Sequence, residues 1–232
     1  MNLSKFMDLA LNKTLWFSRQ DKLKDQFEGE MPIENQIELF NQLKKSNPSN
    51  SSFQNFQKSY DEVEKLAELR KLTLVNSWTH KEYESMALWK IYLDNNSNGI
   101  AIQSTVGNYK ESLKNNDFPI KPVKIDYIDE FEKLPTLNQE IVAGTKMNFY
   151  DYEDEFRGVI FGQFKENGRS KKPKYDFGVN VPVDCNILIS KIVTSPMASE
   201  WFINIIRKVK KDYLDSKEKQ IDIYTSSLKE VI

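Results

Sequence analysis

The chain has 232 residues, of which 39% are hydrophobic and 29% charged, with 8 glycines, 8 prolines and one cysteine. This balance excludes a disordered chain, a collagen-like chain and a disulfide scaffold. Lysine and arginine (33) nearly cancel aspartate and glutamate (34), so no global field attracts nucleic acid or an anionic membrane.

No apolar run approaches the roughly 20 residues that a bilayer span needs. The N-terminal stretch also lacks the basic start and apolar core of a signal peptide. The only cysteine, Cys185, has no companion for a disulfide or a metal cluster. These features predict a globular cytoplasmic protein without a membrane partner.

The first third of the chain alternates between helical and strand patterns. We expect a helix over 4–10 and a strand over 14–18, then a helix that Ser18 caps and Gly29 ends. Apolar residues at three-and-four spacing predict another helix from Pro32 to about Lys45. A linker over 46–52, a helix over 60–72 and a strand over 72–78 follow, so about 32–72 is a helical insertion between the first two strands.

The middle of the chain carries a helix start signal. Thr79 and Glu82 have the spacing of a capping box, and Trp78 and Tyr83 that of a hydrophobic staple, which predicts a helix from there to about Leu93. Strands are expected over 100–106, 119–128, 155–164, 176–184, 187–195 and 220–227, and a helix over 198–213. The irregular mixture predicts one α+β domain over 1–232, with a central mixed, largely antiparallel sheet.

Two short basic stretches, 167–174 and 207–211, are interpreted as a hairpin tip and the solvated end of a helix. They give no strong nucleic-acid signal.

Several stretches, among them "SWTHKEYESMALWKIY" and "YEDEFRGVIF", together resemble a bacterial domain-of-unknown-function family, the one numbered twenty-nine seventy-one. The resemblance spans nearly the whole chain from Leu15 to Trp201. Its characteristic positions correspond to Phe27, Glu28, Ser77, Trp78, Glu84, Ser85, Trp89, Tyr92, Gly99, Glu153, Glu155 and Arg157. One departure is Lys-Asp-Gln at 24–26, where the family has Asn-Asp-Pro and therefore a more rigid turn.

Charged residues gather on the predicted strand at 155–164. Glu155, Arg157 and Val159 share one face of it, and Glu153 extends that face if the strand begins early enough. Charges on a central strand are costly without partners or a ligand. The alternatives are an edge strand with solvated charges or an internal Glu155–Arg157 pair.

Arg19, Ser104-Thr105 and Glu153-x-Glu155, in that order, also resemble the arginine, serine-threonine and glutamate motifs of ADP-ribosyltransferases. "QST" lacks the second serine of that pattern. The resemblance implies an enzyme that consumes NAD as its substrate, in which a carboxylate stabilises an oxocarbenium-like state. Its catalytic residues would be Glu155, Glu153 and Arg157, and its NAD-binding residues Arg19, Ser104, Thr105, Trp78, Glu84 and Tyr92.

Two other functions stay open. One is a non-catalytic module that binds a nucleotide or a peptide, in bacterial stress or phage defence, which is an analogy with other folds. The other is a phosphodiesterase or nuclease whose Mg²⁺ is held by Asp25, Glu28 and Glu84, with Lys146 stabilising charge. A functional site requires the acidic and aromatic residues to line one concavity. A buried polar network joining helix and sheet is the structural alternative.

Overall fold

The computed structural model describes residues 1–23, 33–93, 96–129, 139–162 and 175–231. Contacts divide the chain into two compact units: unit 1 is Met1–Leu15, Lys81–Phe118 and Asn180–Ile232, and unit 2 is Trp16–His80 and Pro119–Val179. Both sides of the expected linker at 46–52 belong to unit 2, so the division does not fall there. The prediction of one domain stays a prediction.

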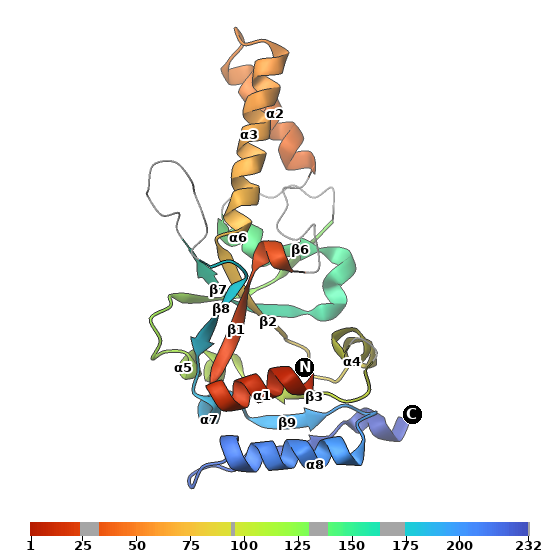
Figure 1. The fold of residues 1–232 in the computed structure, drawn as a ribbon. Helices are drawn as coiled ribbons and strands as arrows, with labels where there is room; N and C mark the ends of the chain where they lie inside the picture. The colour runs from red at the N-terminus through yellow and green to blue at the C-terminus, as the bar shows by residue number, and fades with distance from the viewer. Residues whose placement is uncertain (24–32, 94–95, 130–138, 163–174, 232) are drawn as a thin grey trace. The chain divides into compact units, whose positions relative to one another are not determined.

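The main sheet has five strands in the order β4-β7-β2-β1-β8 (Figure 1). Its strands are β1 (Thr14–Arg19), β2 (Thr73–Thr79), β4 (Ile120–Lys124), β7 (Glu155–Phe161) and β8 (Gly178–Pro182). The pairs β1–β2, β2–β7 and β4–β7 are antiparallel. Strand β7 is buried from its first residue to its sixth, because it lies inside the sheet and packs its apolar residues into the core.

Smaller elements cover this sheet and complete unit 2. Strands β5 (Asp126–Ile128) and β6 (Thr145–Met147) form a parallel pair. Helix α6 (Gln139–Gly144) precedes β6, and the short helix η2 (Asn148–Glu153) leads into β7. Ala143 of α6 contacts Val75 and Val159 in a core cluster, so α6 packs against the face of the sheet that Arg157 shares.

The helical insertion consists of α2 (Ile33–Ser46) and α3 (Ser52–Arg70), which pack against each other between β1 and β2 in the chain (Figure 1). Helix α3 begins before the expected residue 60. Ser51 and Gln54 form a reciprocal capping box, which satisfies free backbone amides at this start. The α+β class, the largely antiparallel main sheet and the helical insertion are confirmed.

Unit 1 contains a three-stranded sheet in the order β10-β9-β3. Strand β9 (Lys191–Thr194) pairs in parallel with β10 (Asp222–Thr225) and antiparallel with β3 (Ile100–Gln103). The helices are α1 (Leu3–Asn12), α4 (Met86–Leu93), α5 (Val106–Ser112), α7 (Cys185–Leu188) and α8 (Glu200–Val209). Helix α8 buries Phe202, Ile203, Ile206 and Val209, the three-and-four spacing of an amphipathic helix.

The helix expected after Ser18 is wrong at its start. Ser18 and Arg19 are the last residues of β1 and pair with Val75 and Leu74, and only a single 3₁₀ turn (Gln20–Lys22) follows. Pairing with β2 satisfies the backbone here and overrides the local capping preference. The remainder of this predicted helix, from residue 24, lies outside the described residues.

The prediction of a capping box at Thr79 and Glu82 is also wrong. Thr79 continues β2, opposite Glu155, and its hydroxyl donates a 2.7 Å hydrogen bond to the carbonyl of Glu153. The helix begins seven residues later at Met86, where the Ser85 hydroxyl accepts from the amide of Leu88. The expected staple partner Tyr83 is 83% exposed.

Several predicted strands are shorter than expected, and one is divided. The strand over 119–128 is two strands, β4 and β5, in different sheets. The strand over 100–106 ends at Gln103, because Thr105 caps α5 by accepting a hydrogen bond from the amide of Asn108. The strand over 187–195 is reduced to β9, since Asp184 caps the helix α7.

Within the described residues, no helix combines the length and apolar composition needed to cross a membrane.

Candidate functional site

The three residues predicted to be catalytic lie in a buried group of charges in unit 2. We call Lys146, Glu153, Glu155 and Arg157 the charge cluster. Their exposed fractions are 7%, 9%, 3% and 0% in that order. Glu155 and Arg157 come from one face of β7, Lys146 from β6, and Glu153 from the end of η2. The cluster therefore joins three consecutive elements of the chain.

Arg157 binds Glu155 through two parallel hydrogen bonds. Its Nε donates to Oε1 at 2.7 Å and its Nη2 to Oε2 at 2.8 Å, while Nη1 donates to the carbonyl of Ala143 at 3.1 Å. Lys146 Nζ lies 2.9 Å from Glu153 Oε2 and 3.3 Å from Glu155 Oε2, and 4.6 Å from the centre of the Tyr150 ring. Two cations thus face two carboxylates, and their formal charges cancel.

These contacts keep the Glu155 carboxylate ionised. Burial by itself raises the pKa of this carboxyl, but the hydrogen bonds and positive charge of Arg157, with the charge of Lys146, outweigh it and lower the pKa. Nearby, the Tyr127 hydroxyl accepts a 2.7 Å hydrogen bond from the Glu155 amide, and burial raises the pKa of Tyr127 to about 12. The site thus holds fixed charges and a neutral phenol.

The geometry leaves little room for a ligand at Glu155. Both carboxylate oxygens are bound by protein cations, and the residue is 3% exposed. A substrate ribose would have to displace one of these bonds, which leaves a buried charge unpaired at considerable cost. The arrangement has the form of the polar network that joins a helix to a sheet, because Arg157 also binds the carbonyl of Ala143 in α6.

Arg19, the residue expected to bind the NAD phosphates, is engaged elsewhere in unit 2. Its side chain donates to both oxygens of Asp21 at 2.8 and 2.6 Å and to the carbonyl of Tyr175 at 3.1 Å. It is 7% exposed. The hydrogen bonding that Arg19 donates to the Asp21 carboxylate is the main cause that raises the pKa of Arg19. The guanidinium therefore already has a carboxylate in the place of a phosphate.

The other predicted binding residues are dispersed. Ser104 and Thr105 follow β3 in unit 1, and Thr105 serves as the cap of α5. Trp78 belongs to unit 2, and its indole nitrogen donates to Asn76 Oδ1 at 2.6 Å. Tyr92, on α4 of unit 1, is 56% exposed.

Glu84 binds the C-terminal part of unit 1. Its Oε1 accepts from the amide of Ser227 at 2.9 Å and from its hydroxyl at 3.0 Å, and its Oε2 accepts from the indole of Trp89 at 3.0 Å. Burial raises the pKa of Glu84, but hydrogen bonds from Ser226, Ser227 and Trp89 outweigh it and lower the pKa. The carboxylate thus ties the start of α4 to the segment after β10.

The ADP-ribosyltransferase hypothesis requires Arg19, Ser104 and Glu155 to border one cleft on neighbouring strands. Strand β2 lies between β1, which carries Arg19, and β7, which carries Glu155. Ser104 follows a strand of the other sheet. Of the residues in the metal hypothesis, Asp25 and Glu28 lie outside the described residues. Phe27 and the basic stretch at 167–174 also lie outside them.

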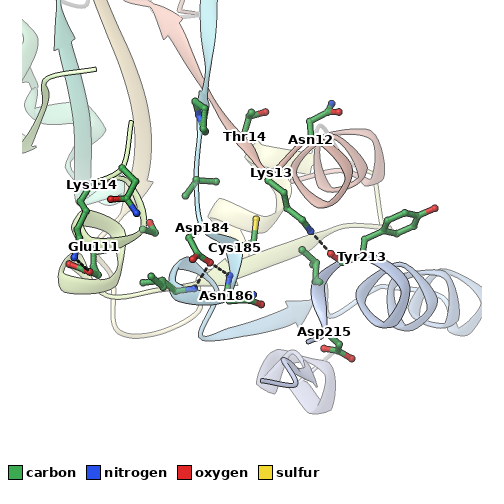
Figure 2. A pocket seen from close by; sticks show the side chains of 16 residues that line it. Asn12, Lys13, Thr14, Glu111, Lys114, Asp184, Cys185, Asn186, Tyr213 and Asp215 are labelled. Atoms are coloured by element: carbon green, nitrogen blue, oxygen red, sulfur yellow. Dashed lines mark hydrogen bonds and ion pairs between the residues drawn. The ribbon is translucent and has the colours of Figure 1, made fainter. Parts of the chain in front are cut away.

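A cavity of about 600 Å³ lies within unit 1 (Figure 2). Four stretches of the chain form its wall: the junction of α1 and β1, the end of α5, the segment around α7 and the segment after α8. Its lining residues are Asn12, Lys13, Thr14, Glu111, Ser112, Lys114, Asn115, Pro182, Val183, Asp184, Cys185, Asn186, Ile187, Tyr213, Leu214 and Asp215. The volume is typical of small-molecule sites.

Lys13 brings a positive charge to this cavity. It ends α1 in the left-handed conformation (φ 53°), and its ammonium donates to the carbonyls of Ala10, at 2.7 Å, and Tyr213. In the described part of the chain, these carbonyls are its only hydrogen-bond partners. Lys114 and Asp215, by contrast, are paired with Glu111 and Lys210. Lys13 is therefore a cation without a carboxylate in direct contact.

Other groups of the wall differ in their availability. Asp184 accepts from the amides of Asn186 and Ile187 at 2.8 and 3.3 Å as the cap of α7 (Figure 2). Burial raises the pKa of the Cys185 thiol to about 11, so it is a weak nucleophile. Among the described residues, the buried Thr14 hydroxyl has no hydrogen-bond partner. Tyr213 is 46% exposed.

The sequence interpretation did not identify the cavity. Its wall combines residues more than 170 positions apart, such as Lys13 and Asp184, and no short motif marks them. The sequence indicates for Lys146 only the role of a charge stabiliser beside a metal. Its place after the apolar stretch "IVAG" is the one local signal that it could be buried.

Comparison with protein-family models, with curated proteins and with solved structures finds no match for this chain. The resemblances to the family numbered twenty-nine seventy-one and to ADP-ribosyltransferases therefore stay predictions.

Proposed function

We propose that the chain is a binding module that holds a small nucleotide in the cavity of unit 1. The observation that carries this proposal is that Lys13, whose ammonium has neutral backbone carbonyls as its partners among the described residues, lines this hollow. A phosphate is the ligand group that matches the ammonium.

Charge supports the assignment of the phosphate to Lys13. Its present partners are neutral backbone carbonyls, so an arriving phosphate adds a charge-assisted hydrogen bond without separating an ion pair. Tyr213, which is 46% exposed, is the aromatic residue of the wall, and a base can stack on a ring of this kind.

The charge cluster supports binding over catalysis. A catalytic carboxylate has to meet the substrate, whereas both oxygens of Glu155 meet protein cations. The NAD-consuming enzyme is the second class that the experiment has to separate from the binding module.

The test is a fluorescence titration with an ATP analogue that carries a methylanthraniloyl group. We expect saturable binding that Lys13→Met weakens roughly 10- to 100-fold, the effect of one charged hydrogen bond. Methionine is an unbranched side chain that is one atom shorter than lysine and lacks the ammonium, and its backbone has the same conformational cost at this φ. The matched control is Lys5→Met on the exposed side of α1, which should bind as the intact protein does.

The single cysteine gives an independent readout of the same cavity. Because Cys185 lines it and the chain has no other thiol, bound ATP should slow the reaction of a thiol reagent with the protein. Absence of both saturation and thiol protection with ATP and AMP would refute the proposal. Nicotinamide release from NAD by the intact protein, lost in Glu155→Gln, would establish the enzyme instead.

A further inference from the structure

Helix α3 carries three aromatic residues on a face that the described part of the chain leaves exposed. Phe53, Phe56 and Tyr60 are 73%, 59% and 51% exposed. Among the α3 side chains that the structure describes, the buried ones are polar: Asn55 is 1% exposed and Ser59 is 7% exposed. In this part of the helix the usual burial pattern is therefore reversed: aromatic side chains face the solvent and polar side chains are buried.

The two sets lie on different sides of the helix. At about 100° per residue, Asn55 and Ser59 are close together, and Phe53, Phe56 and Tyr60 form a stripe centred roughly 110° further round. Helix α2 packs on α3 and yet leaves this stripe exposed. The contact between α2 and α3 therefore does not bury the aromatic residues of the stripe.

The stripe follows a heptad repeat. The spacing of Phe53, Phe56, Tyr60 and Val63 is three, four, three, which places them at alternating a and d positions. Helices with this repeat bury the seam against another helix with the same period. Three half-exposed aromatic rings amount to roughly 350 Å² of apolar surface, close to half of one side of a standard interface.

We propose that two copies of the chain associate through this seam, so that α3 of one copy packs against α3 of the other. A second copy carries the same repeat, and in a parallel pair the two-fold axis sets each a and d residue against its own equivalent. The hairpin of each copy then contributes two helices to a four-helix bundle, which buries an apolar stripe that a two-helix hairpin leaves in water. This inference is independent of the nucleotide site.

The first test measures molecular mass by light scattering after size exclusion. The intact chain of 27.2 kDa should have the mass of two copies. The double variant Phe53→Glu/Phe56→Glu should have the mass of one, with an unchanged helical circular dichroism spectrum. The matched control is Phe149→Glu, which replaces a ring that is 60% exposed on η2 and should leave the dimer intact.

The second test needs no loss of association. The only native thiol, Cys185, is buried, so a cysteine placed on α3 is the reactive one. Of the variants Phe53→Cys, Phe56→Cys and Tyr60→Cys, at least one should form an intermolecular disulfide under mild oxidation, while Phe149→Cys should not. A single-copy mass for the intact protein at about 100 µM, or a dimer that survives the double glutamate variant, would overturn the inference.

Discussion

Replacement of Arg157 by methionine tests whether the charge cluster is a structural core. Arg157 is 0% exposed and donates two hydrogen bonds to Glu155 and one to the carbonyl of Ala143. Arg157→Met leaves two carboxylates facing Lys146 alone, so a net negative charge stays buried. Removal of one partner of a buried ion pair costs about 3–5 kcal/mol, and we expect a loss of this size.

The assay is equilibrium unfolding in urea, an uncharged denaturant, followed by circular dichroism. Arg207→Met is the matched control, because Arg207 pairs with Glu200 at 3.0 Å with a side chain that is 56% exposed. An exposed pair contributes about 0–1 kcal/mol. The two variants remove the same chemical group, so the difference between them measures the effect of burial.

A second variant separates loss of the ion pair from loss of packing. In Glu155→Gln/Arg157→Met the unpaired carboxylate is gone, and the free energy of unfolding should lie above that of Arg157→Met alone. If Arg157→Met loses less than about 1 kcal/mol, or no more than Arg207→Met, the cluster is not a buried ion-pair network. The bonds at Glu155 would then no longer exclude a ligand from this carboxylate.

Four further outcomes are expected. Because the pKa of Glu155 is lowered in the folded state, its contribution to stability is present above its ordinary pKa and is lost as pH falls through the folded value; unfolding of Glu155→Gln between pH 7 and 3 should lack this decline. Gly178→Ala should destabilise the main sheet, since its Cβ would lie 2.3 Å from a backbone carbonyl, whereas Gly107→Ala, in a helix with its nearest contact at 3.7 Å, should be neutral or stabilising by about 1 kcal/mol in the same urea assay. Glu84→Gln should speed hydrogen exchange of the Ser227 amide, which donates to this carboxylate, and unchanged exchange would contradict the role of Glu84 in holding the segment after β10. The Cys185 thiol should react slowly at pH 8 when folded and rapidly in urea, and a fast reaction of the folded protein would show that it is not buried.

The sequence alone determined the fold class and much of the order of elements. Helix α8 and the second half of strand β7 follow from their own patterns, because apolar residues at three-and-four spacing and the apolar run "GVIF" favour burial wherever they fold. The helical insertion follows in the same way. Even the pairing of Glu155 with Arg157 was available as an alternative, since two residues apart on a strand share a face.

Only the tertiary structure decided which local signals prevail. Thr79 and Ser18 are both good caps, yet both lie in strands, because pairing of β2 with β7 and with β1 satisfies more backbone groups than a cap does. Lys146 became the partner of Glu155 through a contact between β6 and β7 that no spacing encodes. The cavity likewise depends on Lys13, Asp184 and Tyr213 meeting from distant segments, and the physical reason is that long-range packing is set by the whole chain.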